Sequence, residues 1–216
     1  MALPPRTGCA DVRFKQTREY FIVAEYICSV LLWLCSLILI LIILTLAFGR
    51  GKSRGQHRRY DKGEEFITAG EVGRYIGYVE SGALKYVCFS SDGTQHVVGL
   101  EFAGYFVCDF PGSLYRQRSR CSVIATVPSE TYCIPSAELA ELMRTDERVL
   151  RVVEATTCEI FYTLYDRHVD LYCKSARQRY DELLSRDSNL FQLFSLKDIA
   201  SLLNITPTHL SRFRMK

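Results

Sequence analysis

The sequence lacks the motifs that usually indicate an enzyme or a metal protein. Its nine cysteines include no pair in the C-x-x-C spacing, which argues against a zinc site, an iron–sulfur cluster or a disulfide framework. The four histidines are scattered, and none pairs with a nucleophile in a catalytic pattern. The segment GRGKS at 49–53 is not a phosphate-binding loop, because Leu46 stands where that motif needs its first glycine. We therefore expect no enzymatic activity and no metal or other cofactor.

A strong overall charge is also missing, because the formal net charge is only +3 at pH 7. Such a value does not by itself indicate a nucleic-acid or membrane partner. The basic residues nevertheless gather in two places. Residues 49–62 hold six lysines and arginines against one acidic residue, and residues 212–216 hold Arg212, Arg214 and Lys216. We interpret residues 49–59 as a solvated basic linker and the C-terminal cluster as a source of attraction for phosphates.

One long apolar run lies near the N-terminus. Residues 26–48 comprise 23 residues without a charge. As a helix they extend about 34 Å, against about 30 Å for the hydrocarbon core of a bilayer. Because most of the positive charge follows the run, the positive-inside rule assigns the C-terminal part to the cytoplasm. The run predicts a single-pass protein of the lipid bilayer, with a short tail at 1–25 and its other domains in the cytoplasm.

Two alternatives stay open for this N-terminal region. The run also suits a helix of a soluble protein that is wholly cytoplasmic, and residues 1–59 need not be the natural lead-in of the chain. A secretory signal peptide fits less well, because about 25 residues precede the run and no small-x-small cleavage site follows it.

Between residues 60 and 135 the pattern changes to short strands separated by turn signals at intervals of about ten residues. The strongest of these signals is Asp92-Gly93, which lies between LKYVCFS and TQHVVGL. An Asp-Gly pair flanked by strand-like segments is typical of a tight β-hairpin. Residues 60–135 are therefore predicted to form an all-β unit.

The C-terminal segment 187–216 has the pattern of two helices joined by a tight turn. Apolar residues at helical spacing surround Ala200, and Asn204 is expected to adopt a left-handed conformation that ends the first helix. Thr206 then caps the second helix, with Pro207 in its first position and Leu210 facing inward. This is a helix-turn-helix signature.

In such a motif the N-terminal part of the second helix enters the major groove of double-stranded DNA. Arginine forks onto guanine there, and hydroxyl groups reach phosphates or base edges. An ordinary helical hairpin with a solvated basic end is the alternative. The residues predicted to contact DNA are Thr206, Thr208, His209, Ser211, Arg212 and Arg214.

Residues 136–186, between these two units, have a helical period. Val149, Val153, Ile160 and Leu164 lie four and seven residues apart on a single stripe. Apolar residues at this spacing favour a partner helix. We predict that the stripe is the interface of a homodimer, since two DNA half-sites favour a twofold protein. Packing of the stripe on the β unit of its own chain is the alternative.

Five features follow one another over residues 60–216. They are the opening YDKGEEFITAGEVGRYIGYVESGALKYV, the Asp-Gly hairpin, the strand GLEFAGYF, a long helix, and RYDELLSRDSNLFQLFSLKDIASLLNITPTHLSRFR. In this order they resemble the Crp/Fnr family of bacterial transcription regulators. The resemblance implies an α+β fold, with a cyclic-nucleotide-binding-type β jelly roll, a long dimerisation helix and a C-terminal winged helix-turn-helix that binds operator DNA.

The chain departs from this family at the effector site. Family members that bind cyclic AMP have a Gly-Glu pair, followed by an arginine and a small residue that hold the cyclic phosphate. Here Gly104 is followed by Tyr105, so we expect no cyclic nucleotide and leave the effector unknown. The resemblance implies that Arg118, Ser119 and Arg120 are the residues that could still bind a phosphate group. The cysteine cluster of oxygen-sensing members is missing, and the end of the chain at Lys216 leaves little for a wing.

Two functions remain after these comparisons. The first is a DNA-binding transcription regulator with a sensory β-barrel that binds operator DNA as a dimer. The second is a membrane-anchored sensor domain of the cyclic-nucleotide type that acts through protein contacts without reading DNA. The segment 195–214 distinguishes the two, because a pure sensor has no need of a helix-turn-helix.

Overall fold

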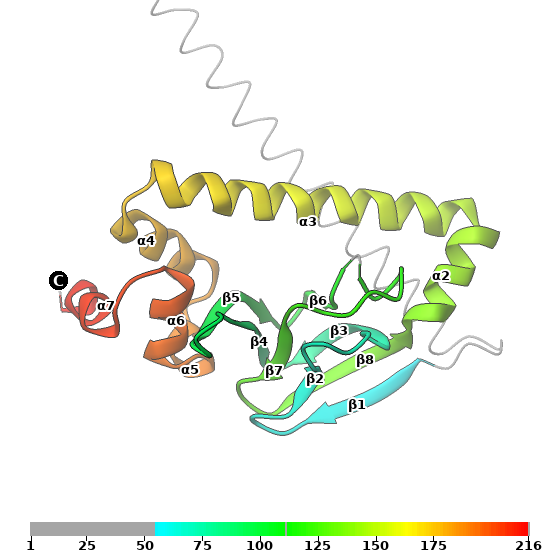
Figure 1. Cartoon of the computed structure of the whole chain (residues 1–216), viewed down its shortest axis with the longest axis horizontal. Coiled ribbons are helices and arrows are strands. Elements are labelled where there is room, and N and C mark those ends of the chain that lie inside the picture. Colours follow the sequence, from blue (N-terminus) through cyan, green and yellow to red (C-terminus); the bar gives the residue numbers. More distant parts are fainter. Residues whose placement is uncertain (1–54, 111, 216) are drawn as a thin grey trace, which may run out of the picture.

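The computed structural model of the chain describes residues 55–110 and 112–215 (Figure 1). A barrel of two β-sheets, one long helix and a group of short C-terminal helices make up this part, which confirms the α+β class. No helix within the described ranges is long and apolar enough to cross a membrane. The predicted span at 26–48 and the tail at 1–25 lie outside the described residues.

The barrel consists of two four-stranded antiparallel sheets with the orders β1-β8-β3-β6 and β2-β7-β4-β5. Apolar side chains from both sheets, including Val79, Leu84 and Val123, fill the space between them. The strands are β1 Gln56–Tyr60, β2 Glu65–Ile67, β3 Tyr75–Ser81, β4 Ala83–Phe89, β5 Gln95–Phe102, β6 Phe106–Val107, β7 Ser122–Ala125 and β8 Ser129–Pro135.

The barrel begins earlier in the chain than the sequence predicts. Residues 56–59, expected in the basic linker, pair with β8 from Gln56 opposite Cys133 to Tyr60 opposite Ser129. The prediction missed this strand because its outward side chains are charged. One of these charged groups, the guanidinium of Arg58, stacks over the Tyr75 ring, with its carbon 3.9 Å from the ring centre. This contact shields part of the apolar face of the tyrosine from water.

The Asp92-Gly93 hairpin forms as predicted between β4 and β5. The backbone N–H of Ser90 donates to the carbonyl of Thr94 at 3.0 Å, and Gly93 has a φ of 82° that suits glycine. Asp92 accepts hydrogen bonds from the Ser90 hydroxyl and the Thr94 N–H. These bonds lower the pKa of Asp92 to about 2. The carboxylate therefore stays ionised, and accepts these hydrogen bonds, across the physiological pH range.

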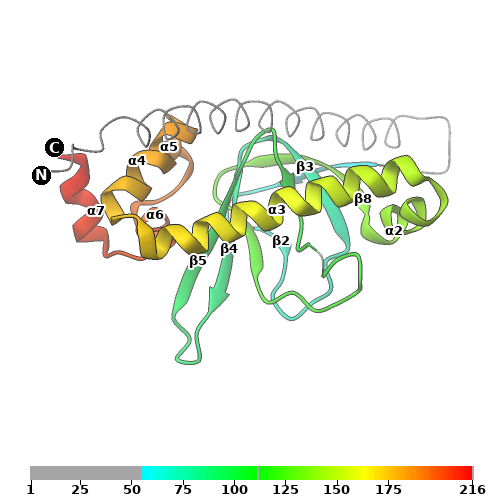
Figure 2. The same ribbon diagram turned by 90° about the horizontal axis from the view of Figure 1, so that it is seen from above.

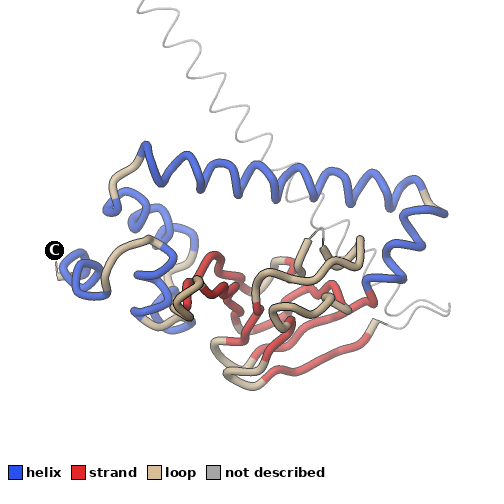
Figure 3. Tube along the Cα trace, in the orientation of Figure 1, coloured by secondary structure: helices blue, strands red, loops and turns tan. Residues whose placement is uncertain are grey.

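The helices follow the barrel in sequence, and several begin at a side-chain cap. Asp146, Ser175, Ser195 and Thr206 each accept a hydrogen bond from a backbone N–H in the first turn of the following helix. Helix α3 runs alongside the barrel, from α2 at one end to α4 at the other (Figures 1 and 3). The helices are α2 Ser136–Thr145, α3 Glu147–Cys173, α4 Ala176–Arg186, α5 Leu190–Leu193, α6 Leu196–Leu202 and α7 Pro207–Arg214.

The stripe predicted as a dimer interface divides into two parts on α3. Val149 and Val153 are buried inside their own chain, where they pack in one cluster with Ile76 and Leu139. The interpretation of these two valines as interface residues therefore needs correction, because their apolar surface is already covered. Leu164, farther along the helix, has 55% of its surface exposed. Heptad spacing alone does not distinguish contact with the barrel from contact with a second chain.

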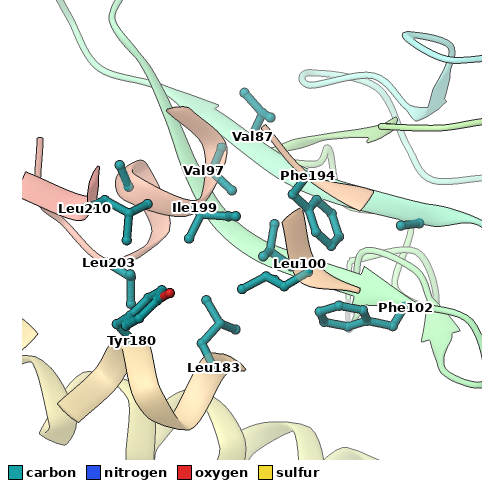
Figure 4. Close-up of a cluster of buried hydrophobic side chains, with 13 residues drawn as sticks. Val87, Val97, Leu100, Phe102, Tyr180, Leu183, Phe194, Ile199, Leu203 and Leu210 are labelled. Carbon is teal, nitrogen blue, oxygen red and sulfur yellow. The ribbon is translucent and has the colours of Figure 1, made fainter. Parts of the chain in front are cut away.

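The outer face of the β4–β5 hairpin forms one core with the C-terminal helices. Along β4 the side chains alternate, so Leu84 faces the barrel interior while Ala83 and Val87 face the helices. Phe102 meets Phe194 edge to face, with ring centroids 5.3 Å apart. Figure 4 shows this cluster, whose labelled members are Val87, Val97, Leu100, Phe102, Tyr180, Leu183, Phe194, Ile199, Leu203 and Leu210.

Two polar contacts join α6 to the same hairpin. Lys85 Nζ donates to Asp198 Oδ1 at 2.6 Å, and the backbone N–H of Val97 donates to the Ser201 hydroxyl at 2.9 Å. The side chains of Lys85 and Asp198 are only 17% and 12% exposed, so water screens their pairing little. Asp198 also accepts from Ser195 as part of a capping box. The ion pair therefore fixes the start of α6 against the barrel.

We predict that Lys85→Met lowers the free energy of unfolding by about 1–3 kcal/mol at pH 7, because it leaves the shielded carboxylate of Asp198 without its cation. Urea titration measures the difference. The control is Arg151→Met, which removes an exposed ion pair with Glu147 and should change stability by less than about 0.5 kcal/mol. An effect of Lys85→Met no larger than that of the control would contradict the proposed role of the pair.

The effect of Lys85→Met should also depend on pH. Burial opposes ionisation of Asp198, but the hydrogen bonds from Lys85 and Ser195 together hold its pKa below the usual value. A lowered carboxyl pKa stabilises the fold above the unfolded pKa of about 4, and that stabilisation is lost as acid protonates the native group. The difference between parent and variant should therefore shrink between pH 5 and pH 3, approximately.

Candidate nucleic-acid interface and ligand pocket

A left-handed residue joins α6 to α7, as the sequence predicts. Asn204 has a φ of 54°, and its backbone N–H donates to the carbonyl of Ser201 at 3.0 Å. The next N–H, of Ile205, donates to the carbonyl of Ala200 at 3.0 Å. These two bonds satisfy carbonyls that the end of α6 would otherwise leave unpaired. The turn therefore fixes the direction in which α7 leaves.

Helix α7 is anchored at its start and on its inner face. The hydroxyl of Thr206 accepts a hydrogen bond from the backbone N–H of His209 at 3.2 Å, and Pro207 occupies the first turn. Leu210 is completely buried in the core shared with the barrel. Because Leu210 fixes the inner side, the opposite side of the helix faces solvent.

The six residues predicted to contact DNA differ in how free their side chains are. Thr208, His209 and Arg212 are exposed, and within the described part of the chain Thr208 and Arg212 form no side-chain hydrogen bond or ion pair. Ser211 is half-buried and donates its hydroxyl to the carbonyl of Pro207 at 3.0 Å. The hydroxyl of Thr206 already serves as the cap.

Arg214 lies near the end of α7 and faces a ring of α5. Its guanidinium carbon lies 4.3 Å from the centre of the Phe191 ring. A cation held over an aromatic face keeps its charge but has fewer orientations. Arg214 can therefore attract phosphate without being free to fork onto a base.

The sequence prediction missed Arg177 on α4. Its Nη1 donates to the carbonyl of Phe213 at 3.1 Å, and its guanidinium lies over the Phe213 ring at 5.6 Å. The same side chain pairs with Asp181 within α4. Arg177 thus holds the end of α7 against α4. Its sequence signal is only the Arg-x-x-x-Asp spacing of an ordinary helical ion pair, which does not reveal a contact with a distant helix.

The residues predicted to hold an effector come from two segments, the β5–β6 turn and the β6–β7 loop. Gly104 and Tyr105 form the turn between β5 and β6, where Gly104 has a φ of 92° and Tyr105 is 53% exposed. Ser119 is buried, and its hydroxyl donates to the carbonyl of Cys121 at 2.7 Å. Arg120 is exposed. Arg118 lines a cavity beside α2.

That cavity has a volume of about 1390 Å³ and lies where the β2–β3 and β6–β7 loops face α2. Arg74 comes from the first loop, Arg116 and Arg118 come from the second, and Arg144 comes from α2. The sequence missed this grouping because the loops and α2 come together only in the folded chain.

One carboxyl group of the barrel interacts electrostatically with arginines of α3 and α4. Burial raises the pKa of Glu101 on β5 to about 7, although the charges of Arg167 and Arg186 and a hydrogen bond from Tyr86 oppose that rise. Burial and the repulsion of Arg186 in turn lower the pKa of Arg167. Burial therefore opposes the ionisation of Glu101, and the two arginines favour it.

One group of side chains has the donors that a metal ion uses. The ring Nε2 of His57 lies 3.3 Å from a carboxylate oxygen of Glu80 and 3.7 Å from one of Glu130. These three residues come from adjacent strands, and each side chain is more than 40% exposed. The distances suit a surface ion pair network as well as a metal, so the group carries no assignment.

Residues 57–146 match the family model of the cyclic nucleotide-binding domain. The described part of the chain also aligns with solved bacterial regulators. FixK2 from Bradyrhizobium japonicum is 22% identical, with a TM-score of 0.66, and the alignment covers 74% of this chain and 83% of FixK2. A candidate cAMP-binding regulatory protein from Silicibacter pomeroyi DSS-3 is 26% identical, with a TM-score of 0.57 and 74% of each chain covered.

A third structure is a candidate transcriptional regulator of the Crp/Fnr family from Eubacterium rectale, with 15% identity, a TM-score of 0.58, and 73% of this chain and 76% of that chain covered. Residues 57–146 therefore resemble a cyclic nucleotide-binding domain, and the described part of the chain has the fold of these solved regulators. The resemblance predicted from the sequence is thereby confirmed. A comparison with curated proteins finds no match.

The left-handed turn before α7 generates a prediction about Asn204. Asn204→Ala should destabilise the protein by about 1 kcal/mol. A residue with a Cβ is strained at a φ of 54°, and alanine has no polar side-chain group that could offset this strain with a local hydrogen bond. Asn204→Gly should be neutral or slightly stabilising, since glycine adopts this conformation freely. Thermal unfolding of the two variants measures the difference. Equal stability of the alanine and glycine variants would show that the turn does not need a left-handed residue.

Proposed function

We propose that the chain is a DNA-binding transcription regulator of the Crp/Fnr type whose helix α7 reads operator DNA. The observation that carries the proposal is the free, basic outer face of α7. Thr208, His209 and Arg212 are exposed there, while Leu210 on the inner face is completely buried. A helix fixed in this way presents these side chains from a defined backbone position, which lowers the entropy lost on binding.

The same proposal includes a homodimer formed through the exposed part of α3. This part carries an apolar surface that no residue in the described ranges 55–110 and 112–215 covers. Such a patch usually indicates an interface with another protein. A second copy is the partner that fits best, since a twofold pair would present two α7 helices to two half-sites. The exposed apolar residues are Phe161, Tyr162, Leu164, Tyr165, Leu171 and Tyr172.

The barrel is the proposed sensory part of this regulator, and its effector is not a cyclic nucleotide in this proposal. The residue after Gly104 is the exposed Tyr105 in place of a ribose-binding glutamate, and Arg118 lines the cavity beside α2. The predicted bilayer span at 26–48 stays a prediction. The alternative of an anchored sensor that reads no DNA is separated from the regulator by the first experiment below.

Arg212→Ala should weaken binding to a specific operator by about 1–3 kcal/mol, because Arg212 is the exposed side chain of α7 best suited to fork onto a guanine. Electrophoretic mobility shift at fixed salt measures the effect, after operator selection with the parent protein. The control is Arg151→Ala, which removes an exposed cation of α3 outside α7 and should leave affinity unchanged. Equal binding of Arg212→Ala and parent to every duplex would remove Arg212 from the interface.

Leu164→Asp should convert the dimer into a monomer at micromolar concentration, because a charge would be buried without a partner in the apolar contact between two α3 helices. Sedimentation equilibrium of parent and variant measures the change. The matched control is Arg151→Asp, at an exposed position near the start of the same helix. A parent protein that sediments as a monomer, or a variant that remains dimeric, would contradict this interface.

A further inference from the structure

The cavity beside α2 lies outside the β-barrel. Apolar side chains of both sheets, among them Ile67, Val107 and Val123, fill the barrel interior. The cavity walls are instead the two loops that contain residues 71–74 and 113–118, helix α2 and Leu150 of α3. Figure 2 shows α2 at one end of the barrel, beside the start of α3. A ligand here would touch the barrel and both helices at once.

The charged residues around the cavity are mostly cationic. Arg74, Arg116 and Arg118 line it and form no ion pair within the described part of the chain, while Arg144 pairs with Glu141. Glu71 is the acidic residue that lines the cavity. Three arginines without a neutralising partner on one concave surface create a field that attracts anions.

The loops hold Arg118 in a defined position. The backbone N–H of Ser119 donates to the carbonyl of Glu71 at 2.7 Å, and Arg118 pairs with Val72 in an isolated β-bridge. The guanidinium Nη1 of Arg118 also donates to the carbonyl of Gly70 at 2.8 Å. Its remaining N–H groups are available, so the side chain is preorganised to receive an anion.

A buried hydroxyl in the cavity wall has no partner. Ser113 is only 1% exposed, and its Oγ forms no hydrogen bond. Buried polar groups in native proteins are nearly always satisfied, so an unpaired hydroxyl in a cavity wall points to a group that binds there. Ser136, nearby in the same wall, already donates to the carbonyls of Gly73 and Arg74. The unmet hydrogen bond therefore belongs to Ser113.

The remaining wall is apolar. Leu114 of the β6–β7 loop, Ala140 and Met143 of α2, and Leu150 of α3 contribute it. Small alanines on α2 leave room beside the larger side chains. An inorganic anion would leave this surface uncovered, whereas a ligand with a hydrocarbon or aromatic part would remove it from water.

We propose that this cavity binds a small organic anion. The charged end of the anion would lie at Arg118 and the neighbouring arginines, and the apolar body of the anion would lie against α2 and Leu150. This inference rests on the proposed sensory role of the barrel. It identifies the effector of that role as a small organic anion. Because the walls include α2 and the first turns of α3, an occupied cavity ties the barrel loops to the helix that carries the proposed dimer surface. Binding energy would then bias the arrangement of α3.

The first test uses naphthalene-2-sulfonate as the probe, with the full chain, in isothermal titration calorimetry. We expect micromolar binding of one molecule per chain. The neutral naphthalene-2-sulfonamide should bind at least about tenfold more weakly, because it forgoes a charge-assisted hydrogen bond, and sulfate alone should bind more weakly still for lack of the apolar part. Equal affinity for the sulfonate and the sulfonamide, or no binding below millimolar, would overturn the proposal.

Three variants locate the probe. Arg118→Gln should weaken binding about tenfold, as expected for one charge-assisted hydrogen bond. Ala140→Leu should reduce binding by filling the apolar wall without altering charge. Arg151→Gln, at the exposed pair on α3, should bind as the parent does. An equal loss in Arg118→Gln and Arg151→Gln would show that the probe responds to general charge and would overturn the site.

Ser113→Ala separates a ligand-binding role from a structural one. Since the hydroxyl has no partner, its removal should leave thermal stability unchanged or raise it, while probe affinity falls severalfold. Lost stability with unchanged affinity would refute the assignment.

These titrations contain no DNA. Probe binding by a chain that reads no DNA would therefore uphold the cavity and refute the regulator, whereas DNA binding without probe binding would do the reverse.

Discussion

The burial of the outer face of β4 and β5 against helices α4 to α7 is the interaction on which the rest of the structure depends. One side of these strands closes the barrel and the other side completes the core of the C-terminal helices. Neither the four-residue α5 nor the seven-residue α6 is long enough to be stable alone in water. Their positions, and through Leu210 the position of α7, are therefore set by the barrel.

This shared core gives the barrel a direct mechanical connection to α7. The ion pair of Lys85 with Asp198 and the hydrogen bond of Val97 to Ser201 fix the rotation of α6, which apolar packing alone leaves less defined. Asn204 and Thr206 then transmit that orientation to α7. A displacement of the β4–β5 hairpin would move the exposed face of α7 with it. The cavity at α2 lies at the other end of α3. The barrel therefore contacts the helices in two places, at the core shared with α4 to α7 and at the loops beside α2.

Features encoded over a few residues could be predicted from the sequence. Asn204, Thr206 and Leu210 have their expected conformation, cap and burial because turn and cap chemistry is local. The Asp92-Gly93 hairpin succeeded for the same reason. Contacts between distant segments could not be predicted. Lys85 and Asp198 are separated by 113 positions, and neither belongs to a motif.

The long helix shows why periodicity reaches a limit. The spacing of Val149, Val153, Ile160 and Leu164 identifies one face of α3 correctly, but it does not say what covers that face. The chain itself covers the first two residues, and leaves Leu164 exposed. The effector residues stay a prediction, and they were transferred from a family pattern that this chain interrupts at Tyr105. The arginines that do share a cavity come from separate loops and from α2.

Selection of binding sites from random double-stranded DNA tests the central claim most directly. If the barrel fixes α7 as a reading helix in a twofold dimer, repeated selection with this protein should enrich one motif with two inverted half-sites centred about one helical turn, or roughly 10 base pairs, apart. Enrichment of such a motif would support an operator-binding regulator. Recovery of unrelated sequences with no common motif, from protein that is folded and dimeric, would contradict it.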